Sequence, residues 1–547
     1  MELYQPNRPI TGGYDAACAA VCRNGTFVGQ NCEGVTVFRG VPFAQPPVGP
    51  LRWQKPVLPE ASEGVFEALH NGPTAIQTRL DSERASFYHQ SEDCLYLNVW
   101  TADGFQGQKR PVMVFIHGGN YGWGGTADPL YDGHKLVKAH PEIVLVTIAY
   151  RVGIFGFMDF SEVPGGEAYI KSGNLGLLDQ ICALRWLREN AGAFGGDAEN
   201  VTIFGESAGG GSVSLLPLIP EAWGLFSRVI AESGSVALTY SRKECLPLTR
   251  KLLKATGAKS MAELAALSEE RLKAVNETVG QVNNFPERDG LVLPLDLYAS
   301  YDLGDAQPVD MLIGTNADEL RYWILDVGGI VAYRQLSHLL FGSTLRQMDA
   351  EDRQRAREFL RLQSKEGVKD RPWQITEFFN ELLFRLPAVR QAEAHAANGN
   401  RVYLYYWKYP SAIRHLRACH AVELAYVFNN LQETIYTGGE GNQALSDRVQ
   451  QMWVNFAVTG DPSIEEITWE PYSEAAPSTM ILDEPLRMEK DWRGTERKSL
   501  LPLLRYQING NSSVPAVDWK PAVVTAAVAA GLGAGALLLW RLLRRKD

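Results

Sequence analysis

Six short apolar runs recur along the chain, and their β-branched and aromatic side chains are typical of buried strands. Helical patterns lie between several of them, for example over residues 178–194, where apolar residues alternate with Arg and Glu. Strands that alternate with helices favour a mostly parallel sheet covered by helices on both faces, so the sequence predicts an α/β fold. The runs are residues 111–119, 143–151, 200–207, 227–235, 309–319 and 401–407.

Two stretches interrupt this alternation. Residues 241–277 and 349–398 are rich in Glu, Lys, Arg, Leu and Ala at helical spacing, which predicts helical insertions lying over the sheet. The 547 residues would suggest several domains at about 100–200 residues each, but large α/β enzymes exceed that size. Because the body of the chain has no internal repeats, we expect one large domain.

A serine lies between the third apolar run and a helical segment. The stretch reads NVTIFGESAGGGSV, in which Gly205 and Gly209 flank Ser207. Glycines allow a sharp turn without Cβ clashes, and the small residues that follow let a helix begin at once. A strand, a Gly-x-Ser-x-Gly turn and a helix are the setting of a nucleophilic serine. The alternative is a serine-rich loop, because the pentapeptide also recurs by chance.

A serine hydroxyl is a weak nucleophile at neutral pH, so acyl transfer needs a base, a group that orients the base, and donors for the oxyanion. The loop VFIHGGNYGWGG follows the first apolar run and leaves the N–H groups of Gly118 and Gly119 open to a developing negative charge. The N–H of Ala208, directly after Ser207, would complete this oxyanion hole. A glycine-rich loop that only turns is the alternative.

Charge and cysteine content exclude other classes of protein. The net charge of -10 gives no electrostatic basis for nucleic-acid binding, which needs a clustered basic face. The seven cysteines are scattered and odd in number, so no disulfide framework is evident. Cys18 and Cys22 are spaced for one helical turn but lack the further ligands of a zinc site. We expect free thiols, and we predict no metal and no cofactor.

Six longer blocks occur in a fixed order: FRGVPFAQPPVGPLRW, SEDCLYLNVW, HGG, YRVGIFGF, NLGLLDQICALRWLRENAGAFGGDAENVTIFGESAGG and WVNFAVTGDPS. Together they resemble the type-B carboxylesterase/lipase family, the α/β-hydrolases that include the cholinesterases. The resemblance covers residues 25–505 and implies one α/β-hydrolase domain there, after an N-terminal extension of residues 1–24. These blocks are far more specific than the serine pentapeptide alone.

The resemblance implies the other members of a Ser-His-Glu triad. In LIGTNADEL the family's acid matches Glu319, while the neighbouring Asp318 is an alternative acid or a helix cap, and the residues alone do not separate the two. CHAVELAYVF resembles the family's His-x-x-Glu-Leu block, which makes His420 the base and leaves His415 as the alternative. Ser233 in AESGS resembles a serine that supports the acid, although a plain strand-end serine fits equally well.

The sequence also departs from the family. Secreted members pair a cysteine with the position of Cys94, but the expected partner region reads NGPTAIQ and holds no cysteine. The stretch RLDSERASFYHQ lacks the tryptophan on which cholinesterases hold a quaternary ammonium, which argues against choline esters. His338 and His395 lie in apolar and Ala-rich helical patterns, and we interpret both as structural.

These observations predict a serine hydrolase of small to medium carboxylic esters that works through an acyl-enzyme. One alternative is a lipase for longer-chain lipid esters, and another is an adhesion or scaffold protein, since some family members keep the fold and lose the chemistry. Members without activity typically lack a triad residue, whereas all three positions are filled here. The pocket is expected to involve residues 120–123, 282–285 and 322–325, and the sequence leaves the acyl preference and the oligomeric state open.

The C-terminus predicts a membrane anchor. Residues 521–540 contain no charge and are long enough to cross a hydrocarbon core of about 30 Å. They follow a polar linker, residues 506–520, and precede a basic tail, residues 541–547. A buried Ala/Gly-rich helix is the alternative interpretation.

Two signals oppose each other on the topology of such an anchor. The basic tail favours a catalytic domain outside the cell by the positive-inside rule. The N-terminus has no apolar segment of the length that a secretory signal needs, and the missing partner of Cys94 suits a reducing compartment. The sequence therefore predicts a tail-anchored enzyme that faces the cytoplasm.

Overall fold

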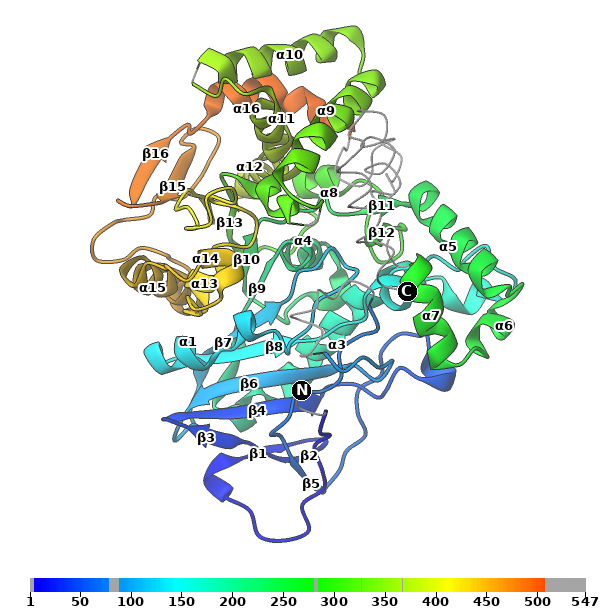
Figure 1. The fold of residues 1–547 in the computed structure, drawn as a ribbon. Helices are drawn as coiled ribbons and strands as arrows, with labels where there is room; N and C mark the ends of the chain where they lie inside the picture. The colour runs from blue at the N-terminus through cyan, green and yellow to red at the C-terminus, as the bar shows by residue number, and fades with distance from the viewer. Residues whose placement is uncertain (1–3, 78–87, 280–283, 326, 366, 507–547) are drawn as a thin grey trace.

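An eleven-stranded sheet runs through the centre of the protein (Figure 1). The computed structural model describes residues 4–77, 88–279, 284–325, 327–365 and 367–506. The strands follow the order β16-β15-β14-β13-β10-β9-β7-β8-β6-β4-β3 across the sheet. Their bounds are β3 (Gln30–Cys32), β4 (Val35–Pro42), β6 (Tyr96–Ala102), β7 (Arg110–Ile116), β8 (Val144–Ile148), β9 (Gly196–Glu206), β10 (Arg228–Glu232), β13 (Asp310–Asn316), β14 (Val402–Trp407), β15 (Ser478–Leu482) and β16 (Arg487–Lys490).

The middle of this sheet is parallel. Every neighbouring pair from β8 through β7, β9, β10, β13 and β14 to β15 is parallel, and the pairs nearer the two edges are antiparallel. Parallel neighbours need a crossover connection, which the helices between the strands supply. The predicted α/β-hydrolase fold with a mostly parallel sheet is therefore confirmed. Two small sheets accompany it: β1 (Ala19–Cys22), β2 (Gly25–Val28) and β5 (Val65–Glu67), and β11 (Tyr240–Ser241) with β12 (Glu287–Arg288).

Both faces of the sheet are buried against apolar side chains, and successive side chains of each strand point to opposite faces. In β9, Ile203 belongs to one apolar core and Phe204 to the other. The same division separates Val229 from Ile230 in β10. The first core also contains side chains of α3 (Leu175–Asn190), α4 (Ala208–Leu215) and α12 (Leu386–Ala397), and the second contains side chains of α1 (His134–Ala139), α13 (Leu424–Val427) and α15 (Gln443–Thr459).

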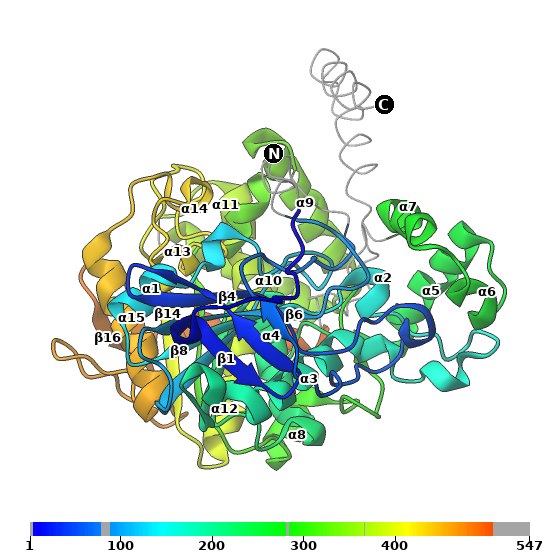
Figure 2. The same ribbon diagram turned by 90° about the horizontal axis from the view of Figure 1, so that it is seen from below.

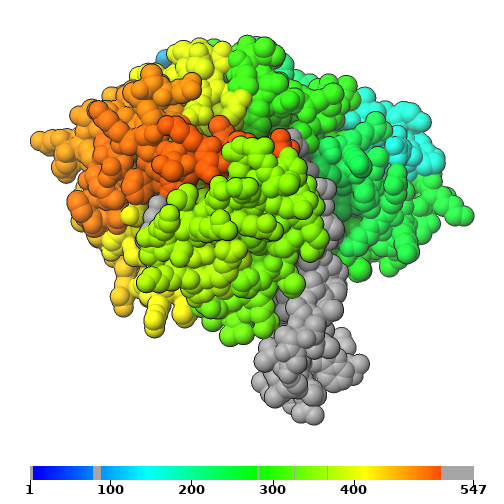
Figure 3. Space-filling view, turned by 90° about the horizontal axis from the view of Figure 1, so that it is seen from above, coloured from blue at the N-terminus to red at the C-terminus, as the bar shows by residue number. Residues whose placement is uncertain are grey.

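Two groups of helices extend beyond these layers. They include helices from both predicted insertions, residues 241–277 and 349–398. Helices α5 (Arg242–Thr256), α6 (Met261–Ala265) and α7 (Glu269–Val279) lie together on one flank in both Figure 1 and Figure 2. Helices α9 (Ile330–Gln347), α10 (Ala350–Lys365), α11 (Arg371–Asn380) and α16 (Gly494–Leu500) share a third apolar core. Seen from above in Figure 3, the segments around residues 340–380 and 490–506 lie side by side.

The remaining helical elements are short. The α-helical ones are α2 (Gly153–Gly156), α8 (Leu297–Leu303) and α14 (Thr434–Thr437). The 3-10 turns are η1 (Ala16–Cys18), η2 (Gly49–Leu51), η4 (Pro129–Tyr131), η5 (Gly166–Tyr169), η6 (Ser172–Asn174), η7 (Ala191–Phe194), η8 (Leu216–Leu218), η9 (Pro220–Ala222), η10 (Glu319–Ile324) and η12 (Leu501–Tyr506), and η11 (Glu381–Arg385) is π-helical.

The predicted membrane anchor requires a correction. Among the described residues, no helix is both long and apolar enough to cross a bilayer, which takes about 20 apolar residues. The longest described helix, α9, has 18 residues and carries Arg334 and Arg346. This finding contradicts the tail-anchored, cytoplasm-facing location, and we withdraw it. Residues 521–540, on which that prediction was based, lie outside the described part of the chain.

Helix α4 begins so close to the ends of β7 and β10 that side chains are excluded there. A Cβ atom at Gly209 would lie 1.9 Å from the carbonyl oxygen of Ile116, and one at Gly210 would lie 2.5 Å from that of Glu232. These contacts are with backbone atoms of buried strands, which cannot move aside. The glycines after Ser207 therefore fix how α4 sits against the sheet.

We expect Gly209→Ala to lower the melting temperature, because its methyl group would overlap the Ile116 carbonyl and cost about 2 kcal/mol or more. Gly192→Ala is the control, since a Cβ atom there meets nothing within 4 Å. Calorimetry of both variants tests the prediction. Equal melting temperatures for the two would show that the close approach of α4 does not constrain the fold.

Candidate functional site

Ser207 lies at the turn between β9 and α4 in a strained conformation. Its φ of 57° and ψ of -117° fall outside the regions that a non-glycine residue ordinarily adopts. Two backbone hydrogen bonds hold the turn: the Ser207 N–H donates to the Glu232 carbonyl at 2.8 Å, and the Gly211 N–H donates to the Ser207 carbonyl at 2.8 Å. The hydroxyl-bearing side chain is therefore presented at the carboxyl end of the parallel strands, where α/β proteins place their sites.

Gly118 and Gly119 follow β7, and Gly118 lies beside this turn. A Cβ atom on Gly118 would be 3.1 Å from Cβ of Ser207 and 2.8 Å from the Glu206 carbonyl oxygen. The N–H groups of both glycines donate no hydrogen bond to any described residue. The N–H of Ala208 is the first in α4, so it has no acceptor one turn earlier inside the helix. Gly118 and Ala208 are thus next to Ser207, and Gly119 follows Gly118 in the same loop.

His117 supports the glycine loop. Its Nδ1 donates to the Gly118 carbonyl at 2.8 Å, and the Tyr150 hydroxyl donates to the His117 carbonyl at 2.8 Å. The two rings are stacked with centroids 4.4 Å apart. Burial lowers the pKa of His117 to about 4, so this imidazole is neutral near pH 7. Sequence reasoning named the loop but not this histidine.

His420 and Glu319 form a short buried hydrogen bond. The Nδ1 atom of His420 donates to Oε2 of Glu319 at 2.6 Å, and the His420 N–H donates to the Glu319 carbonyl at 3.2 Å. Glu319 follows β13 and His420 follows β14, and these strands are parallel neighbours. The alternative histidine, His415, is exposed, and the alternative acid, Asp318, is engaged in an ion pair with Arg321 at 2.7 Å.

The two other histidines of this region take no part in the site. His338 is exposed on α9. His395 is buried in α12, where its Nε2 donates to the Val309 carbonyl at 2.8 Å.

The second ring nitrogen of His420 faces the start of the nucleophile turn. Its Nε2 lies 3.0 Å from Oε1 of Glu206, the residue before Ser207. No hydrogen bond joins His420 to the Ser207 hydroxyl, although both residues belong to the described part of the chain. The structure therefore brings Glu319 and His420 into direct contact and leaves Ser207 beside them, without the serine–imidazole bond.

Ser233 contacts the acid directly. Its hydroxyl donates to Oε1 of Glu319 at 2.7 Å, and the Asn316 N–H donates to the same oxygen at 2.7 Å. Both Glu319 oxygens are therefore bound, one by these donors and one by His420. Ser233 itself has a φ of 48°, directly after β10. The contact is the one expected of a serine that supports the acid.

Three further buried carboxyl groups surround this pair, and sequence reasoning did not assign them. Burial, together with the charge of Glu319, raises the pKa of Glu206 well above its usual range. Burial also raises the pKa of Glu232 well above that range and the pKa of Glu423 to about 8. Trp453 donates to Glu232, and the Asn316 side chain donates to Glu423. The available signal was their position: Glu206, Glu232 and Glu423 stand within three residues of Ser207, Ser233 and His420.

Aromatic side chains from two segments surround the His420 imidazole. The ring centroids of Trp323 and Phe384 lie 5.2 Å and 5.1 Å from it, and that of Tyr322 lies 6.2 Å away. All three rings are only partly buried, whereas His420 is buried. Residues 322–325 were among the expected pocket segments, but Phe384 was missed because it belongs to η11, in the second helical insertion. Of the expected segment 282–285, only residues 284 and 285 are described.

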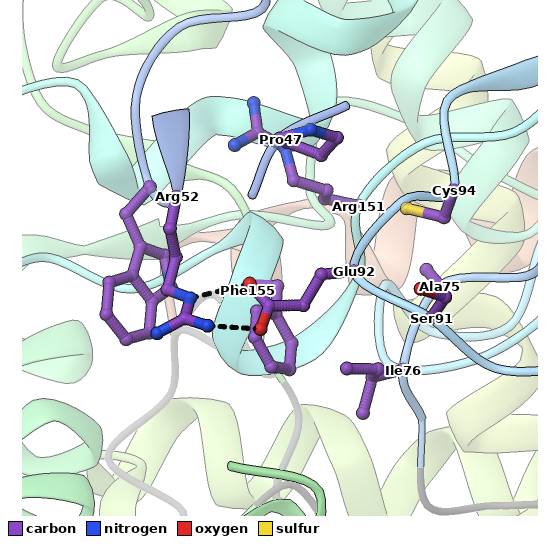
Figure 4. A pocket seen from close by; sticks show the side chains of 10 residues that line it. Pro47, Arg52, Ala75, Ile76, Ser91, Glu92, Cys94, Arg151 and Phe155 are labelled. Atoms are coloured by element: carbon purple, nitrogen blue, oxygen red, sulfur yellow. Dashed lines mark hydrogen bonds and ion pairs between the residues drawn. The ribbon is translucent and has the colours of Figure 1, made fainter. Parts of the chain in front are cut away.

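The described residues also offer cysteines and a small cavity for comparison with the site. They contain no group of three or more His, Cys, Asp or Glu side chains that could bind a metal ion. All seven cysteines are free, and Cys94 is buried without a disulfide partner. Cys94 lines a small cavity with Arg52, Glu92, Arg151 and other residues, none of them a candidate catalytic residue (Figure 4).

Comparison with known proteins identifies the family. The model described as the carboxylesterase family matches residues 19–499. The para-nitrobenzyl esterase of Bacillus subtilis is 36% identical over 498 residues, covering 87% of this chain and 97% of that protein. The human cocaine esterase is 32% identical over 484 residues, covering 80% of this chain and 82% of that protein.

Solved structures agree with this assignment. A carboxylesterase of Geobacillus stearothermophilus matches with a TM-score of 0.79 and 34% identity, covering 88% of this chain and 99% of its own. A thermophilic para-nitrobenzyl esterase matches with a TM-score of 0.75 and 33% identity, covering 89% of this chain and 100% of its own. The chain therefore belongs to the carboxylesterase family and is a carboxylic ester hydrolase.

Proposed function

We propose that this protein hydrolyses carboxylic esters with Ser207 as the nucleophile, His420 as the general base and Glu319 as the acid that orients it. The observation that carries the proposal is the buried 2.6 Å hydrogen bond from His420 to Glu319 beside the strained Ser207 turn. When a carboxylate holds Nδ1, Nε2 is the ring nitrogen that accepts a proton, and Nε2 of His420 faces Glu206 at the start of the Ser207 turn. In enzymes without substrate, the bond from nucleophile to base is often long and shortens in the complex.

The reaction proceeds in two halves. Nε2 of His420 takes the proton of the Ser207 hydroxyl while the Ser207 oxygen attacks the ester carbonyl carbon. The carbonyl oxygen then becomes an anion. The ester C–O bond then breaks, the alcohol leaves with the proton from His420, and an acyl-serine remains. In the second half, water gives one proton to Nε2 of His420 while the water oxygen attacks the acyl carbonyl. The bond between the acyl carbon and the Ser207 oxygen then breaks, the carboxylic acid leaves, and His420 returns the proton to the Ser207 oxygen.

The free N–H groups of Gly118, Gly119 and Ala208 stabilise the oxyanion in both halves. They are backbone donors fixed by β7, His117 and α4, so they need no reorganisation when the charge develops. This is the property that makes such donors effective in a buried site.

Burial disfavours negative charge on the carboxyl groups that neighbour Glu319. Burial raises the pKa of Glu206 and Glu232 well above the usual range, and it raises the pKa of Glu423 to about 8. A second and third negative charge beside Glu319 would cost free energy in this buried setting.

The aromatic rings near His420 favour esters with an apolar, flat alcohol group. His420 protonates the leaving oxygen, so the group bonded to that oxygen lies near Trp323 and Phe384. Apolar groups gain by contact with such rings. The name of the Bacillus subtilis relative refers to an ester of an aromatic alcohol, which agrees with this preference.

The two alternative functions have less support. Long-chain lipid esters were favoured by the predicted membrane segment alone, and the described residues give that segment no support. A purely structural role as an adhesion or scaffold protein does not explain the buried Glu319–His420 bond beside a strained serine. We therefore propose small to medium esters as the substrates.

We expect Ser207→Ala to reduce the turnover of a nitrophenyl ester on the order of 10³-fold or more, because the nucleophile is lost. Ser214→Ala is a matched control, since Ser214 lies on α4, is buried and has a hydroxyl without a hydrogen-bond partner. Stopped-flow detection of the nitrophenol burst measures both. If Ser207→Ala keeps more than a tenth of the activity, Ser207 is not the nucleophile.

We expect the rate of acylation to fall as the pH drops from 8 to 5, because a protonated His420 cannot accept the serine proton. Histidine changes its charge within about this range. The burst rate should be measured across it, so that deacylation does not mask the effect. A burst rate that is constant over the whole range contradicts His420 as the base.

We expect Phe384→Ala to lower kcat/KM about tenfold more for benzyl acetate than for ethyl acetate, because one aromatic contact is worth about 0.5–1.5 kcal/mol beyond the area it buries. Phe66→Ala is the control, since this partly buried ring packs on Phe27 in the small sheet. Equal losses on both esters would place Phe384 away from the alcohol group.

A further inference from the structure

An ion pair stands next to the acid of the proposed triad. Oδ1 of Asp318 lies 2.7 Å from Nε of Arg321, and only 6% and 9% of the two side chains are exposed. Both residues flank Glu319 at the start of η10, and the Arg321 N–H also donates to the Asp318 carbonyl at 2.9 Å. The Asp318 carboxylate makes no capping bond to the backbone of η10, and it contacts the Arg321 side chain of that turn instead.

These contacts reach the loop that carries His420. Nη1 of Arg321 donates to the His415 carbonyl at 3.3 Å, and the Asp318 N–H donates to the Ala418 carbonyl at 2.9 Å. The Asp318 carboxylate also lies 3.5 Å from Nε of Arg417. The pair therefore joins η10 to three points of the segment that ends at His420.

The Arg321 guanidinium is fixed from the other side by α11. Its central carbon lies 4.0 Å from the ring centroid of Trp373, a close cation–π contact. A flat guanidinium can stack on a ring and bind a carboxylate in one geometry, which a lysine ammonium cannot reproduce. Arg321 thus connects η10, the His420 loop and the helical layer.

We propose that Asp318 and Arg321 are positioning residues that hold the His420 loop against η10, so that His420 stays in contact with Glu319. The inference rests on the proposed triad. The loop between the end of β14 and His420 comprises residues 408–419, and a loop of this length has conformational freedom that must be removed. The contacts of Asp318 and Arg321 remove it close to the 2.6 Å bond.

A purely electrostatic role is the competing explanation, because several charges face these groups. Glu206 and Glu319 contact His420, and the buried Glu423 and Glu232 lie near them. On the side of the ion pair, α11 contributes Glu377, whose pKa is raised to about 7 by burial, with Asp318 adding to the shift. The hydroxyl of Tyr333 on α9 and the guanidinium of Arg417 also lie on this side, and Arg493 pairs with Glu377 at 3.3 Å.

Arg321→Lys separates the two explanations, because it keeps the charge and removes the planar fork and the stack on Trp373. Positioning predicts that kcat per titrated active site falls about 10- to 100-fold with little change in KM. It also predicts that the acid limb of the pH–rate profile moves to lower pH, because a loosened Glu319 stabilises the imidazolium less. An electrostatic role predicts wild-type values for both, and that result would overturn the proposal.

The matched control is Arg52→Lys. Arg52 and Glu92 form an ion pair of similar burial, with 9% and 2% of their side chains exposed (Figure 4). Arg52 also donates to the carbonyls of Ala265 and Leu267, away from the triad. We expect this variant to lose stability but to keep kcat per titrated site and the acid limb. If it changes them as Arg321→Lys does, a general loss of stability explains both and the proposal fails.

Asp318→Asn and the double variant test whether the pair acts as one unit. Residues that act together give non-additive effects, so Asp318→Asn/Arg321→Lys should lose no more activity than the more impaired single variant. Losses that multiply would show two independent contributions and contradict a single positioning device.

A measurement without turnover keeps the inference separate from the proposed function. In Ser207→Ala protein, which retains His420 and Glu319, the proton on Nδ1 of His420 should give a low-field 1H NMR resonance because of its short bond. We expect Arg321→Lys to broaden or shift this resonance and Arg52→Lys to leave it unchanged. An unchanged resonance in Arg321→Lys overturns the positioning role. If instead the wild-type protein gives no nitrophenol burst, the proposed function fails, whatever the resonance shows.

Discussion

The hydrogen bond between His420 and Glu319 is the constraint around which the site is built. Its two partners are 101 residues apart in the chain and meet because β13 and β14 are parallel neighbours whose carboxyl ends share one edge of the sheet. The same edge receives Ser207 from β9 and Gly118 from β7. A parallel sheet with this strand order is therefore the physical means by which distant residues reach one place.

Burial gives that bond its electrostatic character. Glu319 is fully buried, and its oxygens are satisfied by His420, Ser233 and the Asn316 N–H. The other carboxyl groups nearby have raised pKa values because burial penalises their charged forms. A single charged carboxylate beside an imidazole is a favourable arrangement in a buried setting, and several charged carboxylates would not be.

Much of the fold followed from local patterns. The six apolar runs predicted strands, and they are β7, β8, β9, β10, β13 and β14 of the central sheet. The glycines around Ser207 predicted a sharp turn, and the structure shows backbone approaches there that exclude a Cβ atom. The predicted membrane anchor was contradicted, because no helix of the described residues has the length and apolarity of a membrane span.

The sequence by itself determined the sheet, the turn and the types of residue available for catalysis, because periodicity, glycine spacing and motif order are properties of short segments. Only the tertiary structure decided that Glu319 contacts His420, that Asp318 pairs with Arg321 instead, and that Phe384 reaches the imidazole. Each of these is a contact between segments far apart in the chain or a choice between adjacent side chains. Such choices depend on the direction in which a turn leaves its strand, which packing fixes and local sequence does not.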